Sequence, residues 1–323
     1  MSESHLPESE KPSHKTAWER DTLERLAFAT LAEQRANRRW RTFFRLAWLT
    51  FAVVLLWAGL HKGSVGGASP SQAHTAVVAI KGEIADGADA SAEWVVTALR
   101  AAFEDEGSQA VVLQINSPGG SPVQAGIIND EIRRLKEKHK KPVYAVVEEA
   151  CASAAYYIAV AADEIYVDKA SIVGSIGVLM DGFGFTGLMD KLGVERRLMT
   201  AGVNKGFLDP FSPQTKPQRA HAQTLLDQIH QQFIQVVREG RGKRLKETPE
   251  LFTGLFWSGQ QAVELGLADG LGNLDYVARE IVKAEDIIDY TRHENVAERL
   301  AKRFGAAMGE GAVRALQTMP VVR

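Results

Sequence analysis

Ser153 and Lys205 are the residues of this sequence best suited to act together in nucleophilic catalysis. Ser153 lies in CASAAYY (residues 151–157), directly after an apolar run at Val143–Val147 that predicts a strand. A serine at a strand-to-helix junction projects its hydroxyl at the carboxyl ends of parallel strands, where open α/β folds build their sites. An ordinary helix N-cap serine is the alternative interpretation.

A serine hydroxyl is a poor nucleophile unless a neighbouring base removes its proton. No histidine occurs between His139 and His221, so a lysine is the more suitable candidate for the base. Lys205 lies in AGVNKGFLDP (residues 201–210), where glycines and apolar residues favour a neutral amine. By composition alone, an ordinary solvated loop lysine remains the alternative.

The loop NSPGGSP at residues 116–122 is a candidate site for stabilising negative charge. It joins a predicted strand to a predicted helix, and Gly119 and Gly120 leave the backbone N–H groups uncovered. Such groups beside a helix N-terminus can stabilise an oxyanion. Taken alone, the loop is explained as well by a tight turn.

The elements that would position these residues alternate between short apolar runs and helical stretches. Such alternation predicts β-α-β crossovers and a mainly parallel sheet with helices outside it. The expected strands are Ala76–Ile80, Ala110–Ile115, Val143–Val147, Glu164–Val167, Ile176–Met180 and Val194–Met199, and the expected helices are Ala92–Glu106, Val123–Lys138, Ser153–Ala162 and Lys216–Gly240.

An apolar segment near the N-terminus predicts a membrane anchor. Residues 46–60 carry no charge, while five arginines and no acid stand at positions 35–45. Under the positive-inside rule, residues 1–41 lie in the cytoplasm and the chain after about residue 61 lies on the extracytoplasmic side. A cleaved signal peptide is the rival, but such signals run about 15–30 residues in total and about 45 precede this apolar run.

The expected domain organisation follows from these segments. It comprises a cytoplasmic polar tail (1–41), a transmembrane signal anchor (42–60), a flexible linker (61–74), a peptidase-like domain (75–285) and a C-terminal amphipathic extension (286–323).

Composition excludes several classes of protein. Lys+Arg 38 against Asp+Glu 40 gives a net charge of −2, which removes the case for a generic nucleic-acid binder. The lone cysteine, Cys151, forms neither an intrachain disulfide nor a multi-thiolate metal site. Cys151 could be considered as a nucleophile, but a lone cysteine is more often a small buried apolar residue. No metal-binding or cofactor motif is implied. GFGFTG at 182–187 matches the G-x-G-x-x-G pattern of dinucleotide-binding loops, but it lacks the following helix that dinucleotide binding needs.

Together these motifs resemble the signal peptide peptidase A family of Ser–Lys serine proteases, within the ClpP/crotonase-like superfamily. The matching stretches are INSPGG at 115–120, ASAAYYIA at 152–159, GSIGV at 174–178, the Lys205 loop, and FTGLFWSGQQAVELGLADGLG at 252–272. The resemblance implies an α/β domain of repeated β-β-α/β-α units. It also implies that Ser153 is the nucleophile, Lys205 its general base and Ser175 the residue that orients the lysine. The N–H groups of Gly120 and Ala154 would form the oxyanion hole. Many relatives have Ser-Gly-Gly where this chain has Ser-Ala-Ala.

The resemblance implies a membrane-anchored serine endopeptidase that needs no cofactor. Its substrates would be remnant signal peptides and other apolar peptides, and it would act as a ring-shaped homo-oligomer at the inner (cytoplasmic) membrane. Two alternatives remain open from the sequence: a crotonase-like acyl-CoA enzyme, and a non-catalytic membrane scaffold. Stabilisation by coenzyme A would favour the first alternative, and failure of Ser153 to react with a fluorophosphonate would favour the second.

Overall fold

The computed structural model describes residues 38–54 and 72–292, which belong to two separate compact units divided after Ser69. Residues 38–54 form a helix, in which the hydroxyl of Thr50 donates to the carbonyl of Leu46. Within the described residues, no helix has both the length and the apolar character needed to cross a membrane. The predicted anchor at 42–60 continues past the described helix, so it stays a prediction. Of the predicted C-terminal amphipathic extension (286–323), residues 293–323 lie outside the described residues.

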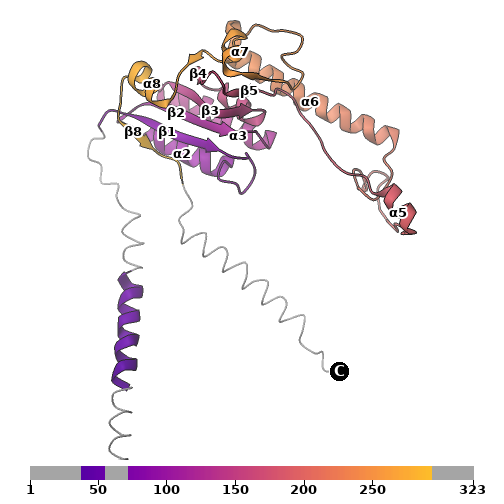
Figure 1. Cartoon of the computed structure of the whole chain (residues 1–323), viewed down its shortest axis with the longest axis horizontal. Coiled ribbons are helices and arrows are strands. Elements are labelled where there is room, and N and C mark those ends of the chain that lie inside the picture. The colour runs from indigo at the N-terminus through magenta and orange to yellow at the C-terminus, as the bar shows by residue number, and fades with distance from the viewer. Residues whose placement is uncertain (1–37, 55–71, 293–323) are drawn as a thin grey trace, which may run out of the picture. The chain divides into compact units, whose positions relative to one another are not determined.

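A mainly parallel sheet forms the centre of the second unit (Figure 1). Its strands follow the order β6-β5-β3-β2-β1-β8, while β4 pairs with β3 and β7 pairs with β4. All of these pairs are parallel except β5 with β6. The strands are β1 (His74–Lys81), β2 (Ser108–Ser117), β3 (Val143–Ala152), β4 (Glu164–Val167), β5 (Ile172–Gly174), β6 (Phe256–Ser258), β7 (Gly270–Leu271) and β8 (Ile287–Asp289).

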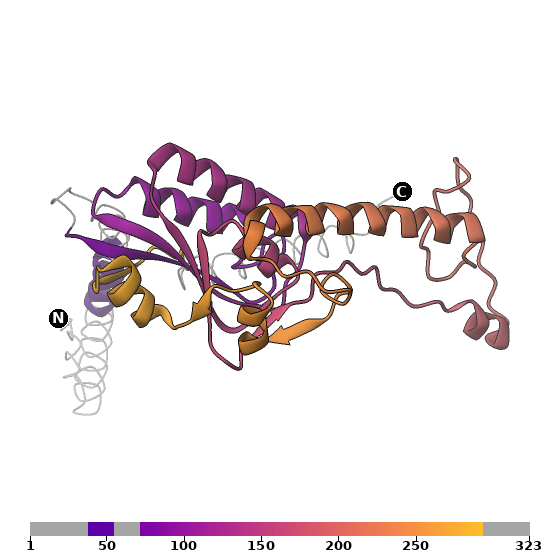
Figure 2. The ribbon, with the colours of Figure 1, turned by 90° about the horizontal axis from the view of Figure 1, so that it is seen from above.

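Helices cover the sheet, with α2 and α3 side by side on one face (Figure 2). Good capping explains α3: the hydroxyl of Ser121 accepts the N–H of Gln124, Pro122 opens the helix, and Lys140 ends it in a left-handed conformation. The helices are α2 (Ala92–Glu104), α3 (Pro122–His139), α4 (Ala154–Ala159), α5 (Thr186–Leu192), α6 (Lys216–Arg241), α7 (Gly259–Glu264) and α8 (Leu274–Tyr276), with a 3-10 turn at Gly242–Arg244 and a π-helical turn at Val277–Val282.

Burial on both faces explains the apolar runs of the central strands. The larger core lies between the sheet and helices α2, α3 and α4, where Val111, Leu113 and Ile115 of β2 point. On the opposite face, Val77, Val112 and Val146 pack against the segment 274–282. Parallel strands covered on both sides read as nearly continuous hydrophobic segments, as β1 and β2 do. The expectation of a mixed α/β domain with a mainly parallel sheet is therefore confirmed.

A long excursion leaves the sheet after β5 and returns through α6. Residues 179–215, which we call the arm, run out beside α6 and carry α5 at their far end (Figures 1 and 2). At the far end the rings of Phe185 and Phe211 stack with centroids 5.5 Å apart, and Arg196 pairs with Asp209 at 3.1 Å. The arm therefore has its own small set of contacts, supported by the N-terminal half of α6.

Two predicted strands are wrong. Residues 176–180 are not a strand; the strand ends earlier, at Gly174, because Gly174 and Ser175 both adopt positive φ angles (108° and 50°) that break an extended run. Residues 194–199 are not a strand either, since they lie in the arm, where no strand is available to pair with them.

The sheet also continues past residue 285, where the peptidase-like domain was expected to end. Strand β8 pairs in parallel with β1, and the N–H of Tyr290 donates to the carbonyl of Val77 at 2.8 Å. A three-residue strand is too short to give a recognisable alternation, so the sequence did not indicate it.

Candidate active site

Ser153 occupies a strained turn between β3 and α4. Its φ and ψ angles are 54° and −122°, an unusual conformation for a residue with a side chain. The N–H of Ser153 donates to the carbonyl of Gly174 at 2.8 Å, which ties the turn to the end of β5. Residues held in such conformations cluster at functional sites, because the surrounding structure must hold them there.

The glycine loop after β2 packs directly against this turn. A Cβ atom added to Gly119 would lie 2.8 Å from the Cβ of Ser153, and one added to Gly120 would lie 2.2 Å from the carbonyl oxygen of Ile84. The loop is held by Ile84, whose N–H donates to Gly119 at 2.9 Å and whose carbonyl accepts from Ser121 at 2.7 Å. Only residues without side chains fit between Ile84 and Ser153, which explains the pair of glycines.

Two backbone N–H groups beside Ser153 are available for a ligand. Gly120 and Ala154 were predicted to form an oxyanion hole, and within the described residues neither N–H donates to another protein group. Ala154 is the first residue of α4. The arrangement fits the chemistry expected of an oxyanion hole, in which fixed N–H donors face developing negative charge.

Ser175 follows the neighbouring strand and lines the same cavity as Ser153. It follows β5 with a φ angle of 50°, and its N–H donates to the carbonyl of Leu255 at 2.8 Å. Its position next to Gly174, which accepts from Ser153, brings the two serines to adjacent strand ends.

A cavity of about 570 Å³ contains four of the five predicted site residues. Its wall is mostly apolar, with a few polar groups, as is usual for sites that bind organic ligands. The lining residues are Pro118, Gly120, Pro122, Ser153, Ala154, Tyr157, Ser175, Gly177, Val178, Leu179, Ile229, Gln232, Phe233, Thr253 and Gly254.

Lys205 is the predicted site residue that the single chain does not bring to this cavity. It lies exposed on the arm, and it is not among the residues that line the cavity around Ser153. The dry surroundings expected from the neighbouring glycines and apolar residues are therefore not provided by the described part of one chain.

Cys151 is excluded as a nucleophile by its position. Its side chain is fully buried in the main core, and burial raises the pKa of the thiol far above its usual range. Because the thiolate is the reactive form, this thiol is inert. The interpretation of Cys151 as a buried apolar residue is confirmed.

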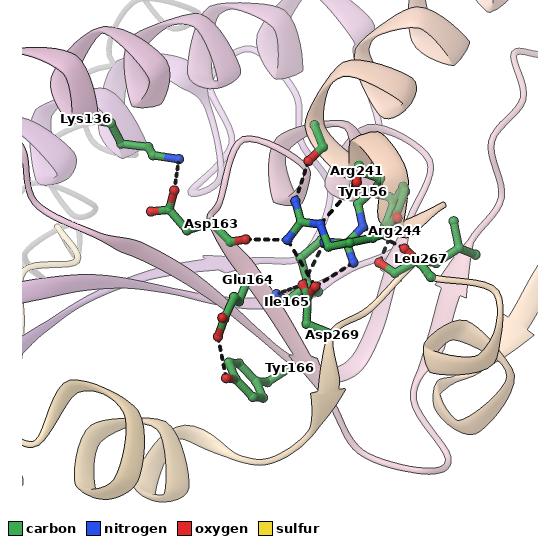
Figure 3. A network of polar contacts seen from close by, with 12 residues as sticks. Lys136, Tyr156, Asp163, Glu164, Ile165, Tyr166, Arg241, Arg244, Leu267 and Asp269 are labelled. Atoms are coloured by element: carbon green, nitrogen blue, oxygen red, sulfur yellow. Dashed lines mark hydrogen bonds and ion pairs between the residues drawn. The ribbon is translucent and has the colours of Figure 1, made fainter. Parts of the chain in front are cut away.

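A buried polar network anchors helix α4, which follows directly after Ser153 (Figure 3). The phenol of Tyr156 in α4 donates to the carbonyl of Leu267 at 2.8 Å, next to Gly266, whose carbonyl accepts from Arg241 of α6. The guanidinium of Arg241 is buried and pairs with both carboxylate oxygens of Asp269, at 2.7 and 3.0 Å.

The carboxylate of Asp269 completes this network. Its burial alone would raise its pKa, but hydrogen bonds and charge from Arg241, with smaller contributions from Ile165 and Arg244, lower the pKa instead. Asp269 therefore stays ionised, and the network joins β4 to α4 and α6, two helices that contribute residues to the cavity wall.

The sequence interpretation missed the part of the cavity wall that comes from α6 and from Tyr157. Ile229, Gln232 and Phe233 share one helix face, as residues three and four apart do. The ring of Tyr157 packs 5.3 Å from that of Phe233, and Tyr157 also lines the cavity. The i, i+3, i+4 spacing on α6 was the available signal, although it does not indicate which surface the helix contacts.

Comparison with known proteins gives a family match across most of this site. The sequence model of peptidase family S49 matches residues 135–287. This segment contains Ser153, Ser175 and Lys205, and it begins after the glycine loop.

Several relatives match over similar lengths of this chain. The protein named Na(+)/H(+) antiporter NhaA of Brucella melitensis is 49% identical over 176 residues, which cover 54% of this chain and 24% of that protein. The protein named "Putative protease MJ0651" of Methanocaldococcus jannaschii is 32% identical over 222 residues, covering 67% of this chain and 71% of that protein. Protease 4 of Haemophilus influenzae is 33% identical over 221 residues, covering 66% of this chain and 35% of that protein. The chain thus spans about a quarter of the length of the antiporter.

Proposed function

This chain belongs to peptidase family S49, a family of serine-type peptidases, and we propose that it hydrolyses peptide bonds through Ser153 and Lys205. The observation that carries the proposal is the strained turn of Ser153, placed in one cavity with the N–H groups of Gly120 and Ala154. The match to peptidases favours this function over acyl-CoA chemistry and over a non-catalytic scaffold. The antiporter name belongs to a protein most of which lies outside the match, so it implies no transport by this chain.

In the proposed reaction, the Oγ of Ser153 forms a bond to the carbonyl carbon of the peptide while its proton passes to the neutral amine of Lys205. The carbonyl oxygen becomes an oxyanion and accepts hydrogen bonds from Gly120 and Ala154; one such donor is typically worth about 2.7–4 kcal/mol. The Lys205 ammonium then gives the proton to the leaving nitrogen as the C–N bond breaks. Water hydrolyses the acyl-enzyme, passing a proton to Lys205 that returns to Ser153. The proposed role of Ser175 is to orient the lysine by a hydrogen bond.

We assign the base to Lys205 of a neighbouring copy of the chain. Lys205 lies exposed on an arm that extends away from the sheet (Figure 1), outside the cavity of its own chain. The same arm exposes large apolar side chains, among them Val203 and Met199, which is characteristic of a surface that another protein covers. A head-to-tail contact, in which the arm of one copy meets the cavity of the next, closes into a ring when the rotation allows it. The proposal includes a more specific fold assignment than a mixed α/β domain: the chain is a ClpP/crotonase-like subunit of such a ring.

The proposed location is the inner membrane, with residues 42–60 as a single anchor and the peptidase domain on the extracytoplasmic side. The support is the apolar run and the arginines that precede it. An anchored enzyme would meet signal-peptide remnants and other apolar peptides where these are concentrated. The apolar lining of the cavity suits such side chains.

The test is made on the full chain in detergent, with a fluorogenic apolar peptide and a fluorophosphonate probe. Ser153→Ala should abolish both probe labelling and cleavage, and Lys205→Met should abolish cleavage, while both variants keep the wild-type melting temperature. A double variant with full activity would refute the assignment.

Mixing the two inactive variants tests whether the base comes from a neighbouring copy. A Lys205→Met chain keeps its serine and a Ser153→Ala chain keeps its lysine, so a mixed assembly contains some complete pairs. Random one-to-one mixing in a head-to-tail ring should restore about a quarter of the wild-type activity. If the base acts within its own chain, the mixture stays inactive.

A further inference from the structure

His230 of α6 makes a contact with the wall of the cavity that the proposed chemistry does not include. Its Nε2 atom lies 3.1 Å from the carbonyl oxygen of Ile176, in the residue that follows Ser175. A carbonyl oxygen only accepts hydrogen bonds, so Nε2 must carry the hydrogen. The imidazole carries a hydrogen there both as this neutral tautomer and as the imidazolium, and the bond survives protonation.

The contact matters because residues 175–178 are not part of the regular strand ladder. Ser175 has a φ angle of 50°, and the N–H of Gly177 folds back to the carbonyl of Ser175 at 2.9 Å. The buried side chain of Ile176 anchors this segment to the core. The peptide group between Ile176 and Gly177 is thus held through its N–H by Ser175, and the contact with His230 holds its carbonyl oxygen.

His230 holds that carbonyl from the helix that forms the opposite part of the wall. Ile229 and Phe233, its neighbours on α6, line the cavity together with Ser175 and Val178. The bond therefore fixes the spacing between two walls of the same cavity, one from α6 and one from the segment after β5.

We propose that His230 is a positioning residue of the active site: its Nε2–H bond to Ile176 holds Ser175 and the segment up to Val178 in the geometry that peptide binding and catalysis require. The inference rests on the proposed peptidase function. His230 touches neither the reacting atoms nor the base in the described residues, and it acts through the segment that it holds.

The test compares two amide variants of the full chain in detergent. His230→Gln places an amide N–H close to the position of Nε2, whereas the shorter side chain of His230→Asn does not reach it. The readouts are kcat and KM for a fluorogenic apolar peptide, with kcat normalised to the sites titrated by fluorophosphonate. His230→Ala is a second variant without a donor, and Val277→Ala, in the core on the opposite face of the sheet, is a control that loses only stability.

We expect His230→Asn and His230→Ala to lower kcat/KM by about tenfold, with both a raised KM and a lowered kcat per titrated site. His230→Gln should stay within about twofold of the wild type. Val277→Ala should lower the melting temperature and leave KM and kcat per site unchanged. The His230 variants would show this same result if His230 had a merely structural role.

The inference alone is overturned if His230→Asn and His230→Ala match the wild type within about twofold, or if His230→Gln is impaired as much as they are. A wild type that neither reacts with the probe nor cleaves peptides would instead overturn the proposed function, and this inference with it.

Discussion

Strain at single residues marks the candidate site. Ser153 and Ser175 both carry side chains at positive φ, and such conformations cost about 1–3 kcal/mol each. Two backbone hydrogen bonds hold them: the N–H of Ser153 donates to the carbonyl of Gly174, and the N–H of Ser175 donates to the carbonyl of Leu255. The strain is thus maintained by the junction of β3, β5 and β6, and it keeps the hydroxyl of Ser153 beside the glycine loop.

At this scale, four of the five residues predicted for the site line one cavity. Gly120, the pair Ser153 and Ala154, and Ser175 come from three separate segments, and the structure places them around one cavity. Ser153 and the glycine loop were predictable because the strand ends of a parallel sheet converge, whereas Ser175 and Ala154 were implied by the family resemblance. The position of Lys205 was not predictable in the same way, since no strand end fixes a residue in the arm.

The residue-scale prediction concerns Gly119. A Cβ atom there would lie 2.8 Å from both the Ser153 Cβ and the Ala152 carbonyl oxygen, and the φ angle of 108° disfavours any side chain. Gly119→Ala should therefore displace the loop that carries the Gly120 N–H, and should lower kcat by about 100-fold, as loss of one oxyanion donor does. The measurement is kcat on a fluorogenic peptide, normalised to titrated sites.

Gly126 provides the matched control for this substitution. It lies in α3, where an added Cβ meets nothing within 4 Å. Gly126→Ala should keep wild-type kcat and raise the melting temperature slightly, since alanine is favoured over glycine in a helix. Equal activity of the two variants would show that the close contact at Gly119 does not matter for catalysis.

At the scale of elements, prediction worked where a pattern was long and for the four-residue strand β4, but it missed the strands of two or three residues and failed where no partner strand was available. Strands β1, β2 and β3 and helices α2, α3 and α6 have enough residues for an apolar run or a helical periodicity, and all six were predicted near their observed positions. The strand predicted at 194–199 failed because this segment lies in the arm, where no strand is available to pair with it. Alternation in the sequence shows that residues are apolar, but it does not show what covers them.

The element-scale prediction concerns the ion pair that joins α2 to α3. Glu131 of α3 accepts from Arg134, its neighbour on the same helix, and from Arg100 of α2, in both cases with contacts of 2.7 Å. The hydrogen bond from Arg134, followed by those contacts with Arg100, lowers the pKa of Glu131 from 4.5 to about 2, although partial burial opposes the shift.

The pH dependence follows from the sign of this shift. Because the carboxyl pKa is lower in the folded chain, its stabilisation is fully present above about pH 4.5 and is lost as the pH falls towards 2. At pH 7, Glu131→Gln should lower the free energy of unfolding by about 1 kcal/mol, a modest value because both arginines are partly exposed and screened. Urea unfolding at pH 7 and at pH 3 should show the difference from wild type shrinking. Glu137→Gln, an exposed site on the same helix, should show no such change.

At the scale of the whole molecule, the features of the second unit fit a subunit better than a self-sufficient enzyme. Its cavity holds a strained serine and N–H donors but lacks a base from its own described residues. Its arm carries the candidate base and presents apolar side chains to solvent. A single contact between the arm of one copy and the cavity of the next would cover the apolar surface and complete the catalytic pair.

The arm therefore carries the prediction for the whole molecule. Val203, two residues from Lys205, is 97% exposed in the single chain, so a charge there costs nothing in an isolated folded copy. In a ring that covers the arm, Val203→Glu would bury an unpaired carboxylate, which is strongly unfavourable. Val203→Glu should therefore dissociate the assembly and abolish cleavage with the melting temperature of the domain retained, whereas Val203→Ala, which adds no charge, should keep both assembly and activity. Sedimentation of the full chain in detergent, with peptide cleavage on the same samples, measures both properties. A Val203→Glu chain that sediments and cleaves like the wild type would show that the arm stays uncovered and that Lys205 does not serve a neighbouring serine.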